Sequence, residues 1–280
     1  MRTNDSLTEQ QAAGGGGAEP LKPLRQIVEQ EMSEGLSEIK RSTPSLFLAG
    51  LSAGLDVGFS LLFIAVTMTL VEGQLSDLVI EILIANAYAI GFIFVVMGRS
   101  ALFTEYTALA TLPVLTGRAS LSSLARLWGV VYLANLVGGA IFAALAALLG
   151  PALGVVDPAI FGEIARGVVG HPWQIILLSG VLAGWLMGLL AWLVAAGRDT
   201  ISQVVFVWLV AASIGFGHFH HSIVGTIEVL AGIFSAQGIT LVDFGHFLLW
   251  ATVGNAVGGV VFVALIAYRL NRSERATTPG

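Results

Sequence analysis

Residues Gly215 to Glu228 read G-F-G-H-F-H-H-S-I-V-G-T-I-E, which places three histidines and a glutamate inside a long apolar stretch. Ionisable side chains are costly in hydrocarbon, so within a membrane segment they usually face a cavity or a bundle interior. Gly215 and Gly217 precede the histidines and predict a helix break, which is tolerated where protein or a water-filled cavity satisfies the backbone. We interpret the stretch as the centre of a transport path. The alternative is a histidine cluster in an exposed loop between two spans.

The composition is typical of an integral membrane protein. Of the 280 residues, 56% are hydrophobic and 11% are charged, whereas soluble domains carry roughly 25% charged residues. Several apolar runs of about 20 residues are long enough to span a bilayer as helices, and the short alternating segments of a membrane β-barrel are not seen. The chain has no cysteine, which excludes disulfides, thiolate metal sites and a cysteine nucleophile.

The chain is predicted to divide into four parts. Residues 1–20 contain a glycine run and polar residues, a composition typical of disorder. Residues 21–43 combine apolar residues at helical spacing with mixed charges, which predicts a cytoplasmic amphipathic helix; the alternative is an extension of the disordered tail. Residues 44–270 form the transmembrane channel or transporter domain, and residues 271–280 form a cytoplasmic C-terminal tail.

Hydropathy predicts six membrane spans in this domain. The second is too long for one ordinary span and is interrupted between Gly98 and Thr107, a stretch that contains Arg99 and Glu105. The fifth is interrupted by the histidine stretch. Interrupted spans at corresponding places in two halves are typical of a binding site built from broken helices. The expected spans are 44–71, 77–113, 121–150, 172–196, 200–236 and 244–269.

Two segments of the chain repeat each other. The sequence from Asn135 reads NLVGGAIFAAL in the third span, and that from Asn255 reads NAVGGVVFVAL in the sixth. Glycines at every fourth position of the first and fourth spans, Gly184 among them, are suited to close helix packing. An odd number of spans in each half inverts the second half in the membrane. The predicted fold class is therefore all-α, with six transmembrane helices in two inverted three-helix repeats and with helices 2 and 5 interrupted.

Basic residues gather on one side of this topology. Both termini and the loops after the second and fourth spans carry arginine or lysine, whereas the opposite side has only Arg166. Positive charge favours the cytoplasmic side. We therefore expect a multi-pass protein of the inner (plasma) membrane with both termini in the cytoplasm.

The predicted symmetry brings the two interruptions together near the membrane midplane. Thr104 of the first and the cluster from His218 to His221 of the second then converge. Half-helix N-termini offer positive dipole ends and free N–H groups, which favour an anion, and imidazoles add a protonatable positive charge. The expected solute is a small monovalent anion or its conjugate weak acid.

These segments resemble the formate/nitrite transporter family across the whole six-span region. The motif L-F-T at 102–104 looks like the family's loop in the second helix, and H-S-I at 221–223 looks like the motif after the break in the fifth. Y-x-x-N-x-x-G at 132–138, G-R at 197–198 and G-N-x-x-G-G at 254–259 are similar to further family segments.

The resemblance implies an aquaporin-like protomer in a homopentamer, with one pore per protomer for small monovalent anions such as formate, nitrite, hydrosulfide or lactate. It places the family's central histidine at His221 and its loop threonine at Thr104. The chain departs from the family where His220 stands for a glutamate, Gly184 for an asparagine and Ile214 for a constriction phenylalanine. It therefore resembles a divergent member.

The mechanism expected from these residues links the solute to protons. The vestibules attract the anion, and Thr104 and His221 hold it at the midplane. The neutral acid then crosses apolar rings made by Leu102, Phe103 and Ile214, because a charged solute would be costly there.

Four further residues complete the expected substrate pathway. His218 and His220 are candidates to relay the proton or to tune His221. Arg99 is a candidate for a fixed positive charge, with Glu105 as its partner; the alternative is a structural ion pair between the two.

Other functions are compatible with the same sequence. A channel and a proton-coupled carrier both fit, and the alternatives are a channel-like pore for another small solute or a non-transporting sensor or scaffold that retains the fold. An enzyme is not expected, because no nucleophile–base spacing, nucleotide loop or metal-ligand set is visible. The expected partners are the small anion, protons and the lipid bilayer, with no cofactor, metal or nucleic acid.

Overall fold

The computed structural model describes residues 22–71 and 73–277, with side chains described as far as Ile266. The tail expected at residues 1–20 lies outside the described residues. The described part of the chain is all helical, with elements α1 (Leu24–Lys40), α2 (Thr43–Val71), α3 (Asp77–Met97), α4 (Phe103–Leu109), α5 (Thr111–Leu115), α6 (Leu121–Ala152), α7 (Pro158–Val169), α8 (Trp173–Ala196), α9 (Thr200–Phe216), α10 (Ser222–Phe234) and α11 (Leu241–Thr277).

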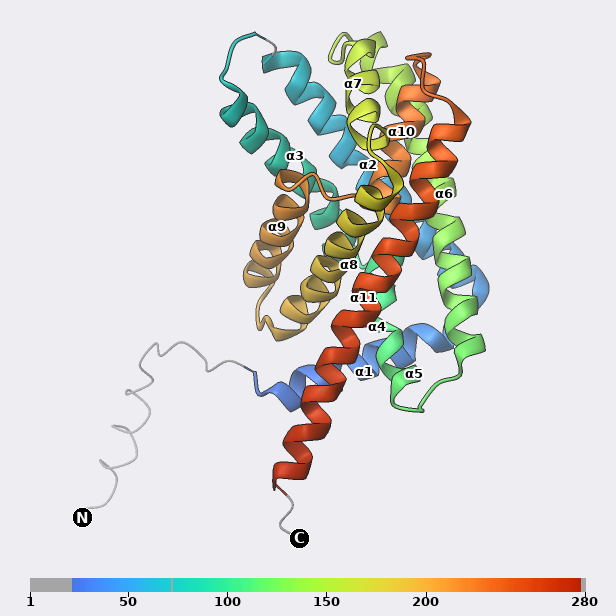
Figure 1. Ribbon diagram of the computed structural model, residues 1–280, viewed down its shortest axis with the longest axis vertical. Helices are drawn as coiled ribbons and strands as arrows, with labels where there is room; N and C mark the ends of the chain where they lie inside the picture. The colour runs from blue at the N-terminus through green and yellow to red at the C-terminus, as the bar shows by residue number, and fades with distance from the viewer. Residues whose placement is uncertain (1–21, 72, 278–280) are drawn as a thin grey trace, which may run out of the picture.

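Five of the described helices are long and apolar enough to cross a membrane: α2, α3, α6, α8 and the Leu241–Ile266 part of α11. Helices α9 and α10 are apolar but shorter. Figure 1 shows the long helices side by side in one bundle, with α1 and α5 at one end and α7 at the other. The chain is therefore an all-helical membrane protein.

The bundle contains two broken helices. Helix α3 ends at Met97 and α4 begins at Phe103, while α9 ends at Phe216 and α10 begins at Ser222. In each break the residue after the capping glycine adopts a left-handed backbone, with φ of 55° at Arg99 and 49° at His218. Non-glycine residues rarely adopt this conformation, so its occurrence at both breaks indicates two locally similar structures.

Close helix packing depends on glycine at Gly184. A Cβ at this position of α8 would lie 2.7 Å from the Cα of Asn255 on α11. Such a contact forces the backbone apart, so any larger residue would separate the two helices. Glycine therefore lets α8 and α11 pack backbone against backbone, the role that small residues serve in membrane bundles.

Hydropathy does not predict α7, which begins at a clear capping signal. The Asp157 carboxylate accepts a hydrogen bond of 2.8 Å from the Ala159 N–H, and Pro158 occupies the first helical position, where its missing N–H costs nothing. The helix has 12 residues and is too short to stand out in a search for spans of about 20 residues.

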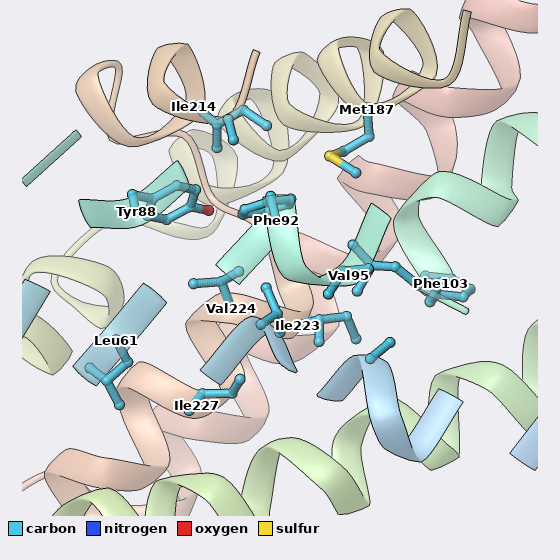
Figure 2. Packing of buried hydrophobic residues seen from close by; sticks show 14 of the residues in the cluster. Leu61, Tyr88, Phe92, Val95, Phe103, Met187, Ile214, Ile223, Val224 and Ile227 are labelled. Carbon is cyan, nitrogen blue, oxygen red and sulfur yellow. The ribbon is translucent and has the colours of Figure 1, made fainter. Parts of the chain in front are cut away.

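The largest apolar cluster of the described residues extends from Ile39 of α1 to Phe161 of α7 and includes residues next to both breaks. Figure 2 shows Leu61 of α2, Phe92 of α3, Met187 of α8, Ile214 of α9 and Ile223 of α10 around a shared interior, and all five are fully buried. A charged solute that entered this interior would lose its hydration without compensation. The fold therefore separates the two ends of the bundle with an apolar layer.

Candidate functional site

Asn135 of α6 fixes the first break. Its Oδ1 accepts a hydrogen bond of 2.8 Å from the Phe103 N–H at the start of α4. Its amide nitrogen donates to the carbonyl oxygens of Gly50 at 2.7 Å and Ala101 at 2.8 Å. One buried amide thus ties α2, the break and α4 together.

Asn255 of α11 repeats this arrangement at the second break. Its Oδ1 accepts a hydrogen bond of 2.8 Å from the Ser222 N–H at the start of α10. Its amide nitrogen donates to the carbonyl oxygens of Gly180 at 2.8 Å and His220 at 2.9 Å. The repeated asparagine motif was visible in the sequence, but its function of satisfying the broken backbone was not.

The two breaks meet at Thr104 and His221. Thr104 Oγ1 lies 2.7 Å from His221 Nε2, and the residues are 0% and 2% exposed. The Val224 N–H donates a hydrogen bond of 3.2 Å to His221 Nδ1. A neutral His221 imidazole therefore carries its proton on Nε2, and this N–H donates a hydrogen bond to Thr104 Oγ1. No described residue accepts the Thr104 hydroxyl hydrogen, which is therefore available to a solute.

The surroundings of this pair are apolar. The ring of Phe92 meets the His221 imidazole edge-on, with centroids 5.2 Å apart. Of the residues expected at a constriction, Leu102 and Ile214 are fully buried. Phe103 turns towards α6, where its ring lies 4.8 Å from that of Tyr132. Nothing in the sequence singles out Phe92, because the residues around it in α3 are apolar as well.

A cavity of about 390 Å³ opens on one side of the pair, next to α7, and is called the α7-side cavity. His221 lies on its wall together with Ile214. Three carboxylates also line it, from Glu81 of α3, Glu163 of α7 and Glu228 of α10.

The other two histidines of the sequence motif lie in this cavity, away from Thr104. His218 is an exposed residue whose Nε2 is 3.1 Å from a Glu81 carboxylate oxygen. The His220 ring is fully engaged, because Nε2 donates to the Val168 carbonyl at 3.1 Å and Nδ1 pairs with the Ser179 hydroxyl at 2.8 Å. Of the three histidines, only His221 touches the threonine.

A second cavity, of about 340 Å³, lies next to α1 and is called the α1-side cavity. Arg99 and Glu105 of the first break line it, and no ion pair joins them in the described part of the chain. Glu31, Glu34 and Glu38 of α1 face the same space, so carboxylates outnumber basic groups there.

Glu31 is strongly affected by this setting. Burial, with additional repulsion from Glu34 and Glu105, raises the pKa of the Glu31 carboxyl from its ordinary 4.5 to about 8. The side chain is therefore largely protonated at neutral pH.

The described residues contain no group of three or more His, Cys, Asp or Glu side chains that could hold a metal ion. A buried polar pair between two broken helices, with a cavity on each side, instead defines a membrane channel or transporter.

Comparison with known proteins identifies the family. The family model of the formate/nitrite transporters matches residues 25–269. The inner membrane protein YfdC of Escherichia coli is 32% identical over 253 residues, covering 89% of this chain and 79% of its own. The nitrite transporter NirC of Salmonella typhimurium is 30% identical over 225 residues, covering 80% and 82%. The chain thus belongs to the formate/nitrite transporter family, whose members are channels and transporters and not enzymes.

Solved structures show the same fold. An FNT family ion channel superposes with a TM-score of 0.78 at 24% identity, covering 88% of this chain and 99% of its own. A pentameric formate channel with formate bound superposes with a TM-score of 0.71 at 25% identity, covering 82% and 97%.

Proposed function

We propose that this protein transports small monovalent anions of the formate and nitrite type across the membrane. Each anion crosses together with a proton, in the form of its conjugate weak acid. The observation that carries the proposal is the buried hydrogen bond of 2.7 Å between Thr104 and His221. It lies between two cavities on a path otherwise closed by apolar side chains. A relative named as a nitrite transporter and a related structure with formate bound support the choice of solute.

The chemistry follows from the donors at the pair. The His221 imidazole donates to Thr104 Oγ1, and the threonine hydroxyl then donates to an oxygen of the solute. A second proton on His221 Nδ1 would displace the Val224 N–H that now donates to it. His221 therefore links solute binding to its own protonation, because it orients the Thr104 hydroxyl that donates to the solute. The neutral acid then crosses the apolar layer.

Arg99 supplies positive charge on the other side of the layer. It lines the α1-side cavity without an ion pair to Glu105, so its guanidinium is available to an anion that enters or leaves there. The surrounding carboxylates limit this attraction to the immediate neighbourhood of the arginine.

We further propose six membrane crossings in two inverted, aquaporin-like halves, in which α3 with α4 and α9 with α10 form the broken crossings. The matching contacts of Asn135 and Asn255 support this arrangement. The related pentameric formate channel supports a homopentamer with one pore per protomer. Basic residues near both termini support a cytoplasmic location for them, and YfdC is described as an inner membrane protein.

Uptake into proteoliposomes tests the function. Formate, nitrite, hydrosulfide and acetate are offered separately at about pH 5 and about pH 7, on either side of the ordinary imidazole pKa. We expect pH-dependent flux of at least one weak acid and its loss in His221→Ala.

Two variants separate function from folding in this test. His221→Asn can still cap α10 but cannot donate to Thr104 in the same way, so it is expected to assemble and to lose flux. His218→Ala, which removes an exposed imidazole, is expected to transport normally. Flux of none of the four weak acids by the wild-type protein would overturn the proposal and favour a non-transporting function.

A further inference from the structure

Glu228 is a buried acid that the proposed mechanism does not use. It is 8% exposed, and it lines the α7-side cavity together with His221 and Gly225. Gly225 and Glu228 are three positions apart and share one face of α10, and His221 caps the start of the same helix. The carboxylate is therefore on the wall that leads to the Thr104–His221 pair.

The Glu228 carboxylate interacts electrostatically with Tyr88, but it has no hydrogen-bond or ion-pair partner in the described part of the chain. No hydrogen bond or ion pair is made by it there, and no lysine or arginine lines the α7-side cavity. An unpaired buried charge is costly, and an intramembrane acid that faces a cavity is commonly part of an ion or proton path. The structure thus leaves the carboxyl group free to act on the contents of the cavity.

The other buried titratable groups of the cavity are less suited to exchange a proton. Both ring nitrogens of His221 and both of His220 are engaged in hydrogen bonds. Tyr88 also lines the cavity, but a phenol holds its proton at neutral pH.

The remaining titratable groups lie nearer the solvent. His218 pairs with Glu81, and Glu163 and His171 are exposed. None of these groups is buried beside the apolar layer.

We propose that Glu228 is the proton-exchange site of the α7-side cavity and the residue that selects weak acids over anions of strong acids. This inference rests on the proposed function. The O–H bond of the Glu228 carboxylic acid breaks as an O–H bond forms on the incoming anion. The neutral acid moves on to Thr104, and the Glu228 carboxylate regains a proton from a hydronium ion in the cavity, which becomes water. In the reverse direction the carboxylate takes the proton from the emerging acid.

Selectivity follows from the same carboxylate. An anion of a strong acid, such as nitrate, cannot take the proton and is repelled whenever Glu228 is ionised. A unit charge a few ångström away, at an effective dielectric constant of about 20, changes the energy of an ion by several RT. We therefore expect discrimination of about tenfold or more from this one residue.

The test compares formate and nitrate flux into proteoliposomes that contain a pH indicator, for the wild type and for Glu228→Gln. The wild-type protein is expected to carry formate with internal acidification and to exclude nitrate. In Glu228→Gln the nitrate-to-formate flux ratio is expected to rise about tenfold and the acidification per formate to fall. Glu163→Gln removes an exposed carboxylate of the same cavity and is expected to match the wild type.

The outcomes are distinguishable. An unchanged nitrate-to-formate ratio and unchanged acidification in Glu228→Gln would overturn the inference and leave the proposed function intact. Absence of weak-acid flux in the wild type would overturn both. Should Glu228→Gln fail to assemble, Glu228→Asp provides the test: it keeps a carboxylate and must still exclude nitrate, and a loss of exclusion in that variant would also overturn the inference.

Discussion

At the scale of single residues, the Thr104 hydroxyl is a buried donor whose hydrogen has no acceptor in the described part of the chain. Thr104→Val keeps the shape of the side chain, removes this donor and leaves the His221 Nε2–H unpaired. Loss of a buried hydrogen-bond partner costs about 1–3 kcal/mol, so we expect weak-acid flux to fall by about tenfold or more. Flux per reconstituted protein measures the effect, and Thr104→Ser, which restores the hydroxyl, is expected to recover most of it. Normal flux in Thr104→Val would rule out this role.

Glu31 gives a residue-scale prediction for stability. The folded-state pKa is raised from 4.5 to about 8, so folding loses stability as pH rises from about 4.5 towards 8 and loses no more above that value. Glu31→Gln removes this penalty and is expected to stabilise the protein by on the order of 2 kcal/mol at pH 8. Near pH 4 the gain is expected to vanish. Thermal unfolding in detergent at the two pH values measures the difference.

A matched control is available on the same helix. Glu29 is exposed, so Glu29→Gln is expected to leave the unfolding temperature nearly unchanged at both pH values. A gain for Glu31→Gln that is equal at pH 4 and pH 8 would contradict the proposed cause.

Residue-level prediction from the sequence depended on how unusual the residue is. The sequence placed Thr104 and His221 opposite each other because polar groups are rare in an apolar run and the repeat relates the two breaks. Phe92 gave no such signal, since one phenylalanine among the apolar residues of α3 looks like any other. His218, His220 and His221 are neighbours in sequence but have three different environments in the structure. These environments depend on tertiary partners such as Glu81, which a local sequence pattern does not reveal.

At the scale of secondary structure elements, the broken helices depend on two asparagines. Asn255 makes three buried hydrogen bonds to the backbone of α8, the second break and α10. Asn255→Ala leaves these backbone groups unsatisfied, and we expect a loss of about 2–4 kcal/mol in stability. The decrease in unfolding temperature measures it. The control is Asn86→Ala in α3, an exposed asparagine that bonds the Ile82 carbonyl and the Trp208 ring N–H, so only a small decrease is expected. An equal decrease in both variants would contradict the structural role of Asn255.

Helix positions were predicted best where the apolar run was long. Helices α2, α6 and α8 begin and end within two residues of the predicted spans, and both breaks lie where glycine and charged or polar residues interrupt the run. Helix α7 was not expected, although Asp157 and Pro158 form an ordinary helix start. It is short and lies outside the spans, so a hydropathy search over a long window does not detect it. The part of the α7-side cavity wall that carries Glu163 was therefore not predicted either.

At the scale of the whole molecule, the orientation in the membrane can be tested because the chain has no cysteine. Ser37 and Glu163 line the α1-side and α7-side cavities, respectively. Basic residues near both termini predict that the α1 side is cytoplasmic. In intact cells a membrane-impermeant maleimide is expected to label Glu163→Cys but not Ser37→Cys, and permeabilised cells are expected to show both. The reverse pattern in intact cells would invert the topology.

The paired asparagine contacts also bear on how such a protein could arise. Asn135 binds the Phe103 N–H as Asn255 binds the Ser222 N–H, so by position Thr104 corresponds to Ile223. An assembly of two separate, identical polypeptides would have to present the same side chain at both of these places. Once two copies of a gene were joined, each copy could mutate alone, so that one has a threonine where the other has an isoleucine. The single Thr104–His221 pair is thus one in which each half supplies one partner, whereas two identical polypeptides would form the same pair twice.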